Sequence, residues 1–229
     1  MTSSLARISL TDQIVKPHRY VISVKHEYKG LIFKETEVPN HKSQWAQQFS
    51  NAFLPLDLEI GVGIGVFFYE LCSKNLNRNH LGLELKYKNL VRAIKKITNN
   101  KLINAKLIRY NAAHINDVFE NEEINNVYIL FPDPWSLKRI QLKHRLIKKD
   151  FLTHLFEIQK KESFVILKTD DCKYFETVLT LVKDSNYKIE NINLDFHLDK
   201  INLEIPLTHF EKIWIKEGKP IKYIKFWKV

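Results

Sequence analysis

The chain has 229 residues, of which 45% are hydrophobic, and its formal net charge is +10 at pH 7. This length and apolar content predict one substantial hydrophobic core, and the charge favours a nucleic-acid partner well ahead of an anionic membrane surface. No apolar run approaches the roughly 18 residues that a membrane span requires. The N-terminus lacks the apolar stretch of an export signal, and Cys72 and Cys172 have no metal-ligand spacing. We therefore expect a reduced, cytoplasmic protein with no membrane partner and no metal.

Residues 1–44 are expected to form an N-terminal extension with a β-hairpin. Residues 20–24 and 31–33 are short runs rich in β-branched and aromatic side chains, and the pair Lys29-Gly30 provides a turn between them. After a polar stretch the pattern changes, and residues 45–229 are expected to form the main domain.

From residue 56 onward, short apolar runs alternate with segments of helical periodicity. This alternation predicts an α/β fold with a mostly parallel sheet, right-handed crossovers and helices on both faces. The expected strands are 56–60, 80–84, 106–109, 127–131 and 164–168, and the expected helices are 66–73, 86–98, 150–159 and 173–182. The tail has strand-like runs at 187–194 and 221–227 with little helix between them, which predicts an antiparallel edge.

A glycine-rich turn follows the first of these strands. Gly61, Gly63 and Gly65 suit a tight turn that opens a helix and lets the backbone approach a ligand closely. The dinucleotide-binding fingerprint would place its third glycine at position 66, where this chain has Val66. The turn therefore fits a nucleotide-type ligand other than a pyrophosphate, although glycine used for packing alone is the alternative.

Polar side chains follow the predicted strands at the edge where open α/β sheets bind ligands. Glu59 ends the first strand, and Glu84 ends the second, where an acid can bind a ribose hydroxyl. Two acids beside a glycine turn favour a ligand with a ribose and a cationic tail, such as S-adenosylmethionine. Asn111, after the third strand, is a candidate for an adenine contact or a simple turn residue.

A single acid lies between two prolines at the end of the fourth strand. Pro132 and Pro134 restrict the backbone around Asp133, and Trp135 follows. The segment 138–149 then holds six Lys or Arg residues and no acid. Such a run suits the phosphates of a polyanion, while a solvated helix face is the alternative.

These motifs resemble those of the bacterial tRNA (guanine-N7-)-methyltransferases from about residue 45 onward. The resemblance includes Leu58 to Gly65, Gly82-Leu83-Glu84, Asn111-Ala112, Phe131 to Trp135, Lys168-Thr169-Asp170, Asp195-Phe196-His197 and Thr208 to Glu211. It implies a seven-stranded, Rossmann-like class I methyltransferase. Methyl transfer from S-adenosylmethionine to N7 of guanosine 46, in the variable loop of tRNA, is the implied reaction.

The resemblance also implies roles for individual residues. Asp133 is the expected catalytic residue and also contacts the methyl donor. The other expected cofactor contacts are Glu59, Gly61, Gly63, Gly65, Glu84, Asn111 and Ala112, and the expected substrate contacts are Lys138, Arg139, Asp170, Thr208, His209, Phe210 and Glu211. The family's substrate lysine position holds Leu137 here, so Lys138 or Arg139 is the expected replacement. The 20–36 hairpin either adds a tRNA contact or covers a sheet edge.

Guanine N7 carries a lone pair and no proton, so its attack on a sulfonium methyl needs no obligate general base. We expect alignment and carboxylates that stabilise the cationic product base to supply the catalysis. Two other hypotheses are a nucleotide-dependent oxidoreductase and a non-catalytic RNA-binding protein on the same fold. A monomer and a homodimer are both compatible with the sequence.

Overall fold

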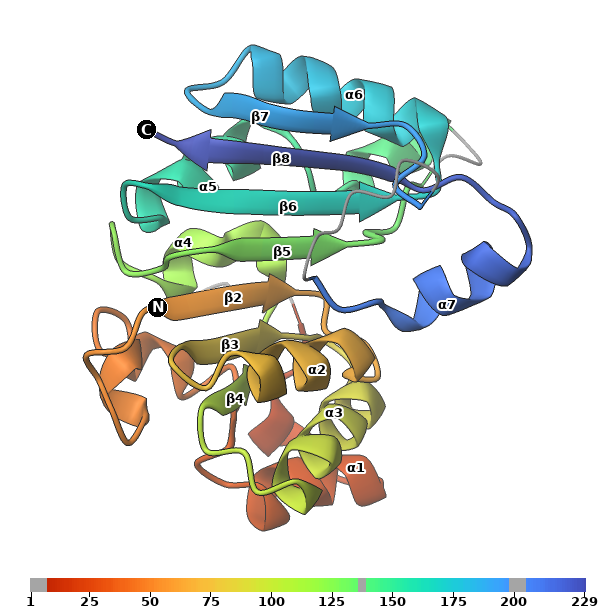
Figure 1. Cartoon of the computed structure of the whole chain (residues 1–229). Coiled ribbons are helices and arrows are strands. Elements are labelled where there is room, and N and C mark those ends of the chain that lie inside the picture. The colour runs from red at the N-terminus through yellow and green to blue at the C-terminus, as the bar shows by residue number, and fades with distance from the viewer. Residues whose placement is uncertain (1–7, 136–138, 198–204) are drawn as a thin grey trace.

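A mixed β-sheet forms the centre of the computed structural model, which describes residues 8–135, 139–197 and 205–229 (Figure 1). Its strands are β1 (Ile32–Phe33), β2 (Leu56–Ile60), β3 (Asn79–Leu83), β4 (Ala105–Ile108), β5 (Val127–Leu130), β6 (Ser163–Thr169), β7 (Lys188–Asn193) and β8 (Lys222–Lys228). Within the described residues the sheet has eight strands in the order β1-β4-β3-β2-β5-β6-β8-β7. β8 pairs antiparallel with both β6 and β7, and the other pairs are parallel. The predicted parallel sheet with an antiparallel edge is confirmed.

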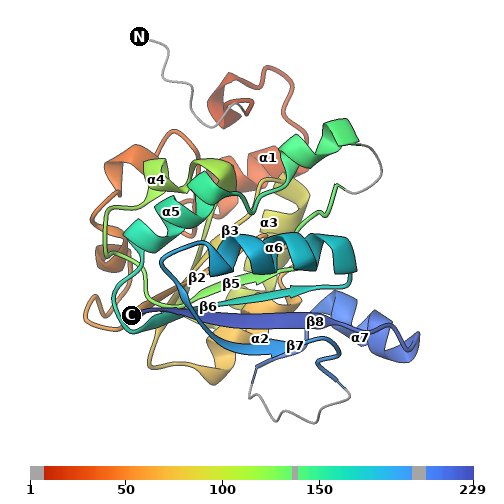
Figure 2. The ribbon, with the colours of Figure 1, turned by 90° about the horizontal axis from the view of Figure 1, so that it is seen from above.

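Helices cover both faces of this sheet. They are α1 (Arg19–Ile22), α2 (Val66–Lys74), α3 (Tyr87–Asn99), α4 (Ile115–Val118), α5 (Lys149–Ile158), α6 (Cys172–Lys183) and α7 (His209–Lys216). α4, α5 and α6 lie on one face, and α2 lies on the other (Figure 2). Across the described ranges, no helix combines the length and apolarity needed to cross a membrane.

Alternation along the strands divides the core between the two faces. In β5, Val127 and Ile129 pack with α4, α5 and α6, whereas Tyr128 packs with α2. Glu59 is opposite Tyr128 in the register of β2 and β5, so its carboxylate lies on the α2 face. Asp57 lies on that face too, where Arg78 donates to its carboxylate at 2.5 and 2.6 Å. Two acids of one buried strand therefore lie on this face, and of the two only Asp57 pairs with a cation among the described residues.

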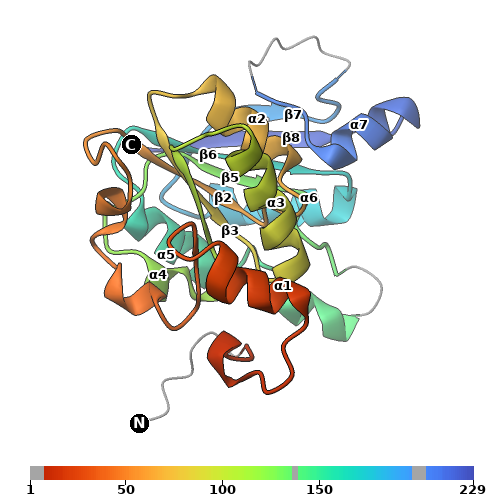
Figure 3. The same cartoon turned by 90° about the horizontal axis from the view of Figure 1, so that it is seen from below.

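The expected hairpin at residues 20–36 is wrong. The chain forms α1 and a π-helical turn, Ser23–Glu27, which lie beside α3 (Figure 3). Val21, Val24 and Tyr28 are buried at helical spacing, and the last two pack in one cluster with α3. β1 then pairs parallel with β4, so the sheet gains an eighth strand beyond the seven expected. The extent of the extension, 1–44, stays a prediction.

The expectation of little helix between the last two strands is also wrong, because α7 lies between β7 and β8. Thr208 caps this helix: its hydroxyl accepts from the Glu211 N–H at 3.0 Å, and the Glu211 carboxylate accepts from the Thr208 N–H at 2.7 Å. This reciprocal pair is a capping box, which satisfies two N–H groups that a helix start otherwise leaves without partners.

A buried polar cluster attaches the N-terminal segment to the end of β4. Arg109 donates to the Glu35 carboxylate at 2.7 Å, and the two side chains are 4% and 0% exposed. The Thr11 hydroxyl donates to the same carboxylate at 2.8 Å and lies 2.9 Å from the Tyr87 hydroxyl. The Arg109 guanidinium also lies 4.0 Å from the centre of the Tyr87 ring. Because the ions are desolvated, each depends on its partner.

We predict that Glu35→Gln lowers the free energy of unfolding by about 3–5 kcal/mol, because it leaves the Arg109 guanidinium buried without a carboxylate. Urea denaturation followed by circular dichroism measures this loss. Asp12→Asn is the matched control, since Asp12 is 46% exposed in its pair with Lys34 and its loss should cost about 0–1 kcal/mol. Equal losses in the two variants would contradict the assigned role of the Glu35–Arg109 pair.

Candidate functional site

The carboxyl ends of five neighbouring strands bring the predicted site residues to one edge of the sheet. In the order β4, β3, β2, β5 and β6, these strands are followed by Asn111, Glu84, the glycine turn, Asp133 and Asp170. Adjacent parallel strands end side by side, so residues far apart in the chain line one edge. The spatial order of the motifs follows the strand order and differs from their order in the sequence.

The glycine turn joins β2 to α2. Gly61 and Gly63 have φ of +84° and +57°, and an added Cβ at Gly61 would meet nothing within 4 Å. Gly65 differs, because an added Cβ would lie 2.5 Å from the Cβ of Ala93 on α3. Gly61 and Gly63 thus leave open space at the sheet edge, whereas close packing of α2 on α3 accounts for Gly65.

Glu59 carries a buried carboxylate at the end of β2. The residue is 3% exposed, and its Oε2 atom has no hydrogen-bond partner among the described residues. Burial raises the pKa of Glu59 well above its ordinary value, and the nearby negative charge of Glu84 raises it further. A carboxylate in this state is suited to a cationic or hydrogen-bond-donating ligand.

Glu84 and Asn111 organise the two loops beside the glycine turn. Glu84 Oε2 accepts from the Gly63 N–H at 2.9 Å, and its Oε1 accepts from the N–H groups of Leu85 and Lys86 at 2.7 and 2.8 Å. The Asn111 side chain accepts from the Ala113 N–H at 3.1 Å and caps the short 3-10 helix Ala112–His114. Both side chains therefore brace the loops on which they lie.

The glycine turn, the buried acid and the bracing loops fit S-adenosylmethionine. The partnerless Oε2 atom of Glu59 could accept a hydrogen bond from an ammonium group. The open space at Gly61 and Gly63 could admit a ligand against the backbone. Glu84 provides a carboxylate for ribose hydroxyls beside that space. The described residues include no group of three or more His, Cys, Asp or Glu arranged to hold a metal ion.

Asp133 is exposed in the proline-flanked loop after β5. The loop begins with Phe131 and ends with Trp135, which have left-handed φ of 53° and 46°. The Phe131 N–H donates to the Lys168 carbonyl at 2.8 Å, which ties the start of the loop to β6. This tie and the prolines hold Asp133 at the edge between β2 and β6.

Arg145, from the basic run, braces the other side of this loop. Its Nε donates to the Pro134 carbonyl at 2.7 Å, its Nη1 donates to Thr177 at 3.2 Å, and its guanidinium lies 4.7 Å from the centre of the Tyr174 ring. Lys143, His144, Lys148 and Lys149 remain exposed. Arg145 therefore stabilises the Asp133 loop through contacts within the protein. Its position in a run of cations did not indicate this role.

Two expected substrate contacts, Lys138 and Arg139, cannot be compared in full with the structure. Lys138, like Leu137, lies outside the described residues. Arg139 begins the 3-10 helix Arg139–His144, of which the backbone is described at that position. The replacement of the family's lysine by Lys138 or Arg139 stays a prediction.

The Thr208–Glu211 motif divides into buried and exposed members. Glu211 is 0% exposed: its Oε1 accepts from Lys168 Nζ at 2.6 Å, and its Oε2 belongs to the capping box. His209 is exposed, and Phe210 is 51% exposed. Both oxygens of Glu211 thus already have partners within the protein, and its expected contact with the substrate stays a prediction.

Phe210 belongs to an aromatic surface between the Asp133 loop and α7. Its ring lies 5.9 Å from that of Phe131 and stacks with that of Trp214 at 6.3 Å and 21°. Lys219 lies 3.9 Å from the centre of the Trp214 ring. Phe210 is the exposed ring of the three, and an exposed aromatic face suits a planar base.

The chain matches a family model described as "Putative methyltransferase" over residues 54–224. It is 35% identical to a tRNA (guanine-N(7)-)-methyltransferase of Bdellovibrio bacteriovorus, over 91% of this chain and 100% of that protein. The chain belongs to the tRNA (guanine-N(7)-)-methyltransferase family. A family member of the same name from Alkaliphilus metalliredigens is 31% identical over 89% of this chain and 95% of that protein.

Membership in the tRNA (guanine-N(7)-)-methyltransferase family favours methyl transfer over an oxidoreductase or a non-catalytic RNA-binding protein. A solved structure of a methyltransferase from Aquifex aeolicus has a TM-score of 0.52 and 12% identity, covering 91% of this chain and 98% of that one. This likeness confirms the Rossmann-like fold. The individual site residues stay predictions.

We predict that Glu59→Gln weakens S-adenosylmethionine binding about 10- to 100-fold, since a charged acceptor is lost. The same change should raise the melting temperature of the ligand-free protein at neutral pH. The raised folded-state pKa of Glu59 means that stability falls as pH rises above the unfolded-state pKa. Calorimetric titration and thermal melts across pH test both effects.

Glu70→Gln on α2 is the control, because Glu70 forms a partly exposed pair with Lys212 at 3.1 Å and should contribute less than about 1 kcal/mol. If Glu59→Gln bound the cofactor as tightly as this control, the role assigned to the buried carboxylate would be wrong.

Proposed function

We propose that the protein transfers a methyl group from S-adenosylmethionine to N7 of a guanosine in tRNA, guanosine 46 of the variable loop. The observation that carries the proposal is the row of acids on adjacent strand ends, Glu84, Glu59 and Asp133, in a member of this family. The relatives' names give the reaction and the RNA class, and the acids provide sites for a methyl donor next to a reacting base.

Three groups are proposed to hold the cofactor. Glu84 would bind the ribose hydroxyls, Glu59 the cationic methionine end, and Asn111 the adenine edge, with Ala112 and the glycine turn supplying backbone contacts. When bound, the cofactor supplies a sulfonium methyl group that a nucleophile can attack. Glu59 then gains the donor that its Oε2 atom lacks among the described residues.

The protein's part in the chemical step is alignment and charge stabilisation. N7 attacks the methyl carbon with its lone pair, the carbon–sulfur bond breaks, and the base acquires a positive charge. Asp133 and Asp170, both exposed after neighbouring strands, are placed to stabilise this cation. Fixing the two reactants in line can supply about 7 kcal/mol of the barrier.

The guanosine is proposed to bind between the Asp133 loop and the start of α7. Asp170, His209 and Phe210 are the exposed candidates for direct contact. Thr208 and Glu211 complete the family motif, and their capping box fixes the N-terminus of α7 that carries those contacts. The exposed lysines of the 139–149 segment would hold phosphates, giving affinity without base specificity.

A cytoplasmic location and the choice between monomer and homodimer stay predictions from the sequence. Nucleoside analysis after incubating bulk tRNA with a labelled methyl donor tests the proposed reaction directly. Recovery of the label in 7-methylguanosine is the expected result, and label in any other nucleoside would refute it.

We predict that Asp133→Ala lowers kcat at least about 100-fold, since a carboxylate facing the developing cation is removed. Its affinity for tRNA should stay within about twofold of wild type, because phosphate contacts dominate that affinity. Single-turnover methylation and filter binding measure the two quantities. Near wild-type turnover would remove Asp133 from the reaction.

Arg145 and Lys143 should give opposite results although both carry one positive charge. We expect Arg145→Gln to lower kcat about tenfold by loosening the Pro134 loop, since small misplacements of reacting groups are costly. Lys143→Gln should instead weaken tRNA binding and lower the slope of log K against log salt by roughly 1. If both variants changed only tRNA affinity, the bracing role of Arg145 would be excluded.

A further inference from the structure

A groove on the N-terminal segment lies outside the site described above. It has a volume of about 540 Å³ and is lined by His18, Arg19, Tyr20, Lys86, Tyr87 and Lys88. The groove is next to the sheet edge that holds the proposed cofactor site, because the Lys86 N–H donates to Glu84 at 2.8 Å. It therefore lies at the β3 side of the edge, whereas Asp133 and Asp170 follow β5 and β6.

Aromatic rings form the walls of this groove. The His18 ring meets the rings of Tyr20 and Tyr87 edge to face, at 5.8 and 5.9 Å. Arg19 covers the Tyr20 ring at 4.7 Å and donates to its hydroxyl at 2.6 Å. Aromatic faces combined with guanidinium groups are the usual platform for unpaired nucleotides.

The lysines and the arginine that line the groove make it basic. Arg19, Lys86, Lys88 and Arg92 are exposed, and none forms an ion pair with an acid among the described residues. The hydrogen bond from Arg19, and then the charges of Arg19, Lys88 and Arg92, lower the pKa of Tyr20. Positive charge beside aromatic rings favours an anionic nucleotide over a neutral ligand.

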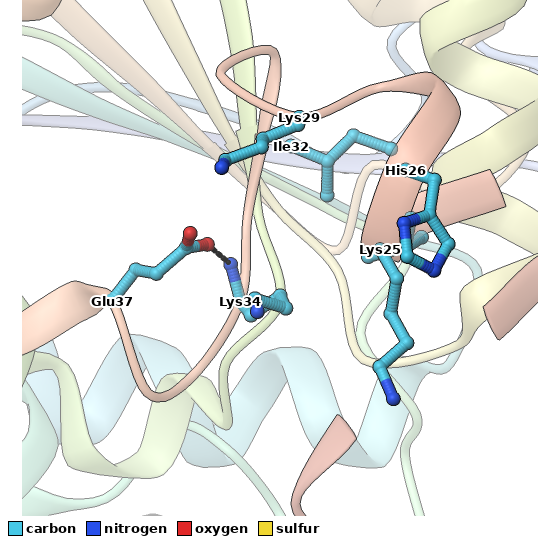
Figure 4. Close-up of a pocket in the computed structure, with 7 residues that line it drawn as sticks. Lys25, His26, Lys29, Ile32, Lys34 and Glu37 are labelled. Carbon is cyan, nitrogen blue, oxygen red and sulfur yellow. Dashed lines mark hydrogen bonds between the residues drawn. The ribbon is translucent and has the colours of Figure 1, made fainter. Parts of the chain in front are cut away.

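A second hollow nearby gives a contrast. It has a volume of about 340 Å³ and is lined by Val24, Lys25, His26, Lys29, Ile32, Lys34 and Glu37 (Figure 4). Two of its lysines share an acidic neighbour, because Asp12 lies 2.9 Å from the Lys34 ammonium and 3.8 Å from that of Lys25. The backbone N–H of Lys34 also donates to Glu37 at 2.7 Å. Charge compensation makes this hollow the weaker candidate for an anion.

We propose that the groove between α1 and the start of α3 binds a nucleotide of the tRNA substrate other than the target guanosine. Arg19 and Lys88 would contact phosphates, and Tyr20 would stack on a base. This inference rests on the proposed function, since it takes tRNA as the substrate. It gives the N-terminal segment a direct part in holding the RNA, beyond covering the edge of the sheet at β1.

The test uses the full-length protein and an unmodified tRNA transcript, with affinity measured across a salt titration. Arg19→Gln/Lys88→Gln should weaken tRNA binding about tenfold at moderate salt and lower the slope of log K against log salt by roughly 1 to 2. Tyr20→Ala should weaken binding about fivefold or more with little change in slope, because stacking is lost while charge is kept. The affinity of these variants for S-adenosylmethionine should match that of wild type.

Lys25→Gln/Lys34→Gln in the compensated hollow is the matched control, since it removes the same number of positive charges from two lysines that both pair with Asp12. Wild-type tRNA affinity in the groove variants would overturn the proposal, as would an equal loss in the control. A change confined to S-adenosylmethionine affinity would also overturn it. Nucleoside analysis of the wild-type reaction separates the two proposals. If the groove variants lost tRNA affinity in a salt-dependent way but the wild-type protein formed no 7-methylguanosine, the proposed function would be wrong and the proposed RNA contact at the groove would still hold.

Discussion

The buried ion pair between Lys168 and Glu211 is the contact on which the substrate side of the proposed site depends. Both side chains are 0% exposed, and their nitrogen and oxygen are 2.6 Å apart. Burial lowers the pKa of Lys168, while the negative charge of Glu211 opposes that shift. The carbonyl of Lys168 also accepts from Phe131 at the start of the proline-flanked loop. One residue of β6 therefore joins the Asp133 loop to α7, and losing either charge would leave the other desolvated and uncompensated.

The cofactor side follows the opposite electrostatic arrangement. Glu59 is as buried as Glu211, but its Oε2 atom has no partner among the described residues, and its pKa is raised. Asp57, two residues earlier on β2, is compensated by Arg78. A core that supplies a cation for one acid and none for its neighbour destabilises the empty site, and binding of a cationic ligand relieves that destabilisation. In the proposed site, the protein's own residues thus compensate the buried charge on the substrate side, and the ligand would compensate it on the cofactor side.

The sequence predicted the central sheet because strands such as β5 are short apolar runs between turn residues, and because α3 has a clear helical period. The residues at strand ends followed from the same topology. The two errors had local signals: Val21, Val24 and Tyr28 are spaced as in a helix, and Thr208-x-x-Glu211 is a capping box. No local signal pairs Arg109 with Glu35, 74 residues away, or Arg145 with Pro134, because such partners are set by the tertiary fold.

The partners of the charged side chains are likewise set by the tertiary fold and not by the local sequence. A net charge of +10 predicts a polyanionic partner but does not locate it, since the chain uses its cations in two ways. Arg109 and Lys168 are buried against carboxylates, so their charges are compensated inside the protein. Arg19 and Lys88 are exposed beside aromatic rings, where no acid pairs with them among the described residues. Only the second kind can release counterions from a nucleic acid, because a cation already paired with a carboxylate gains little from a phosphate. Burial and partner, rather than the density of lysine and arginine along the chain, therefore determine which basic segments are suited to bind RNA.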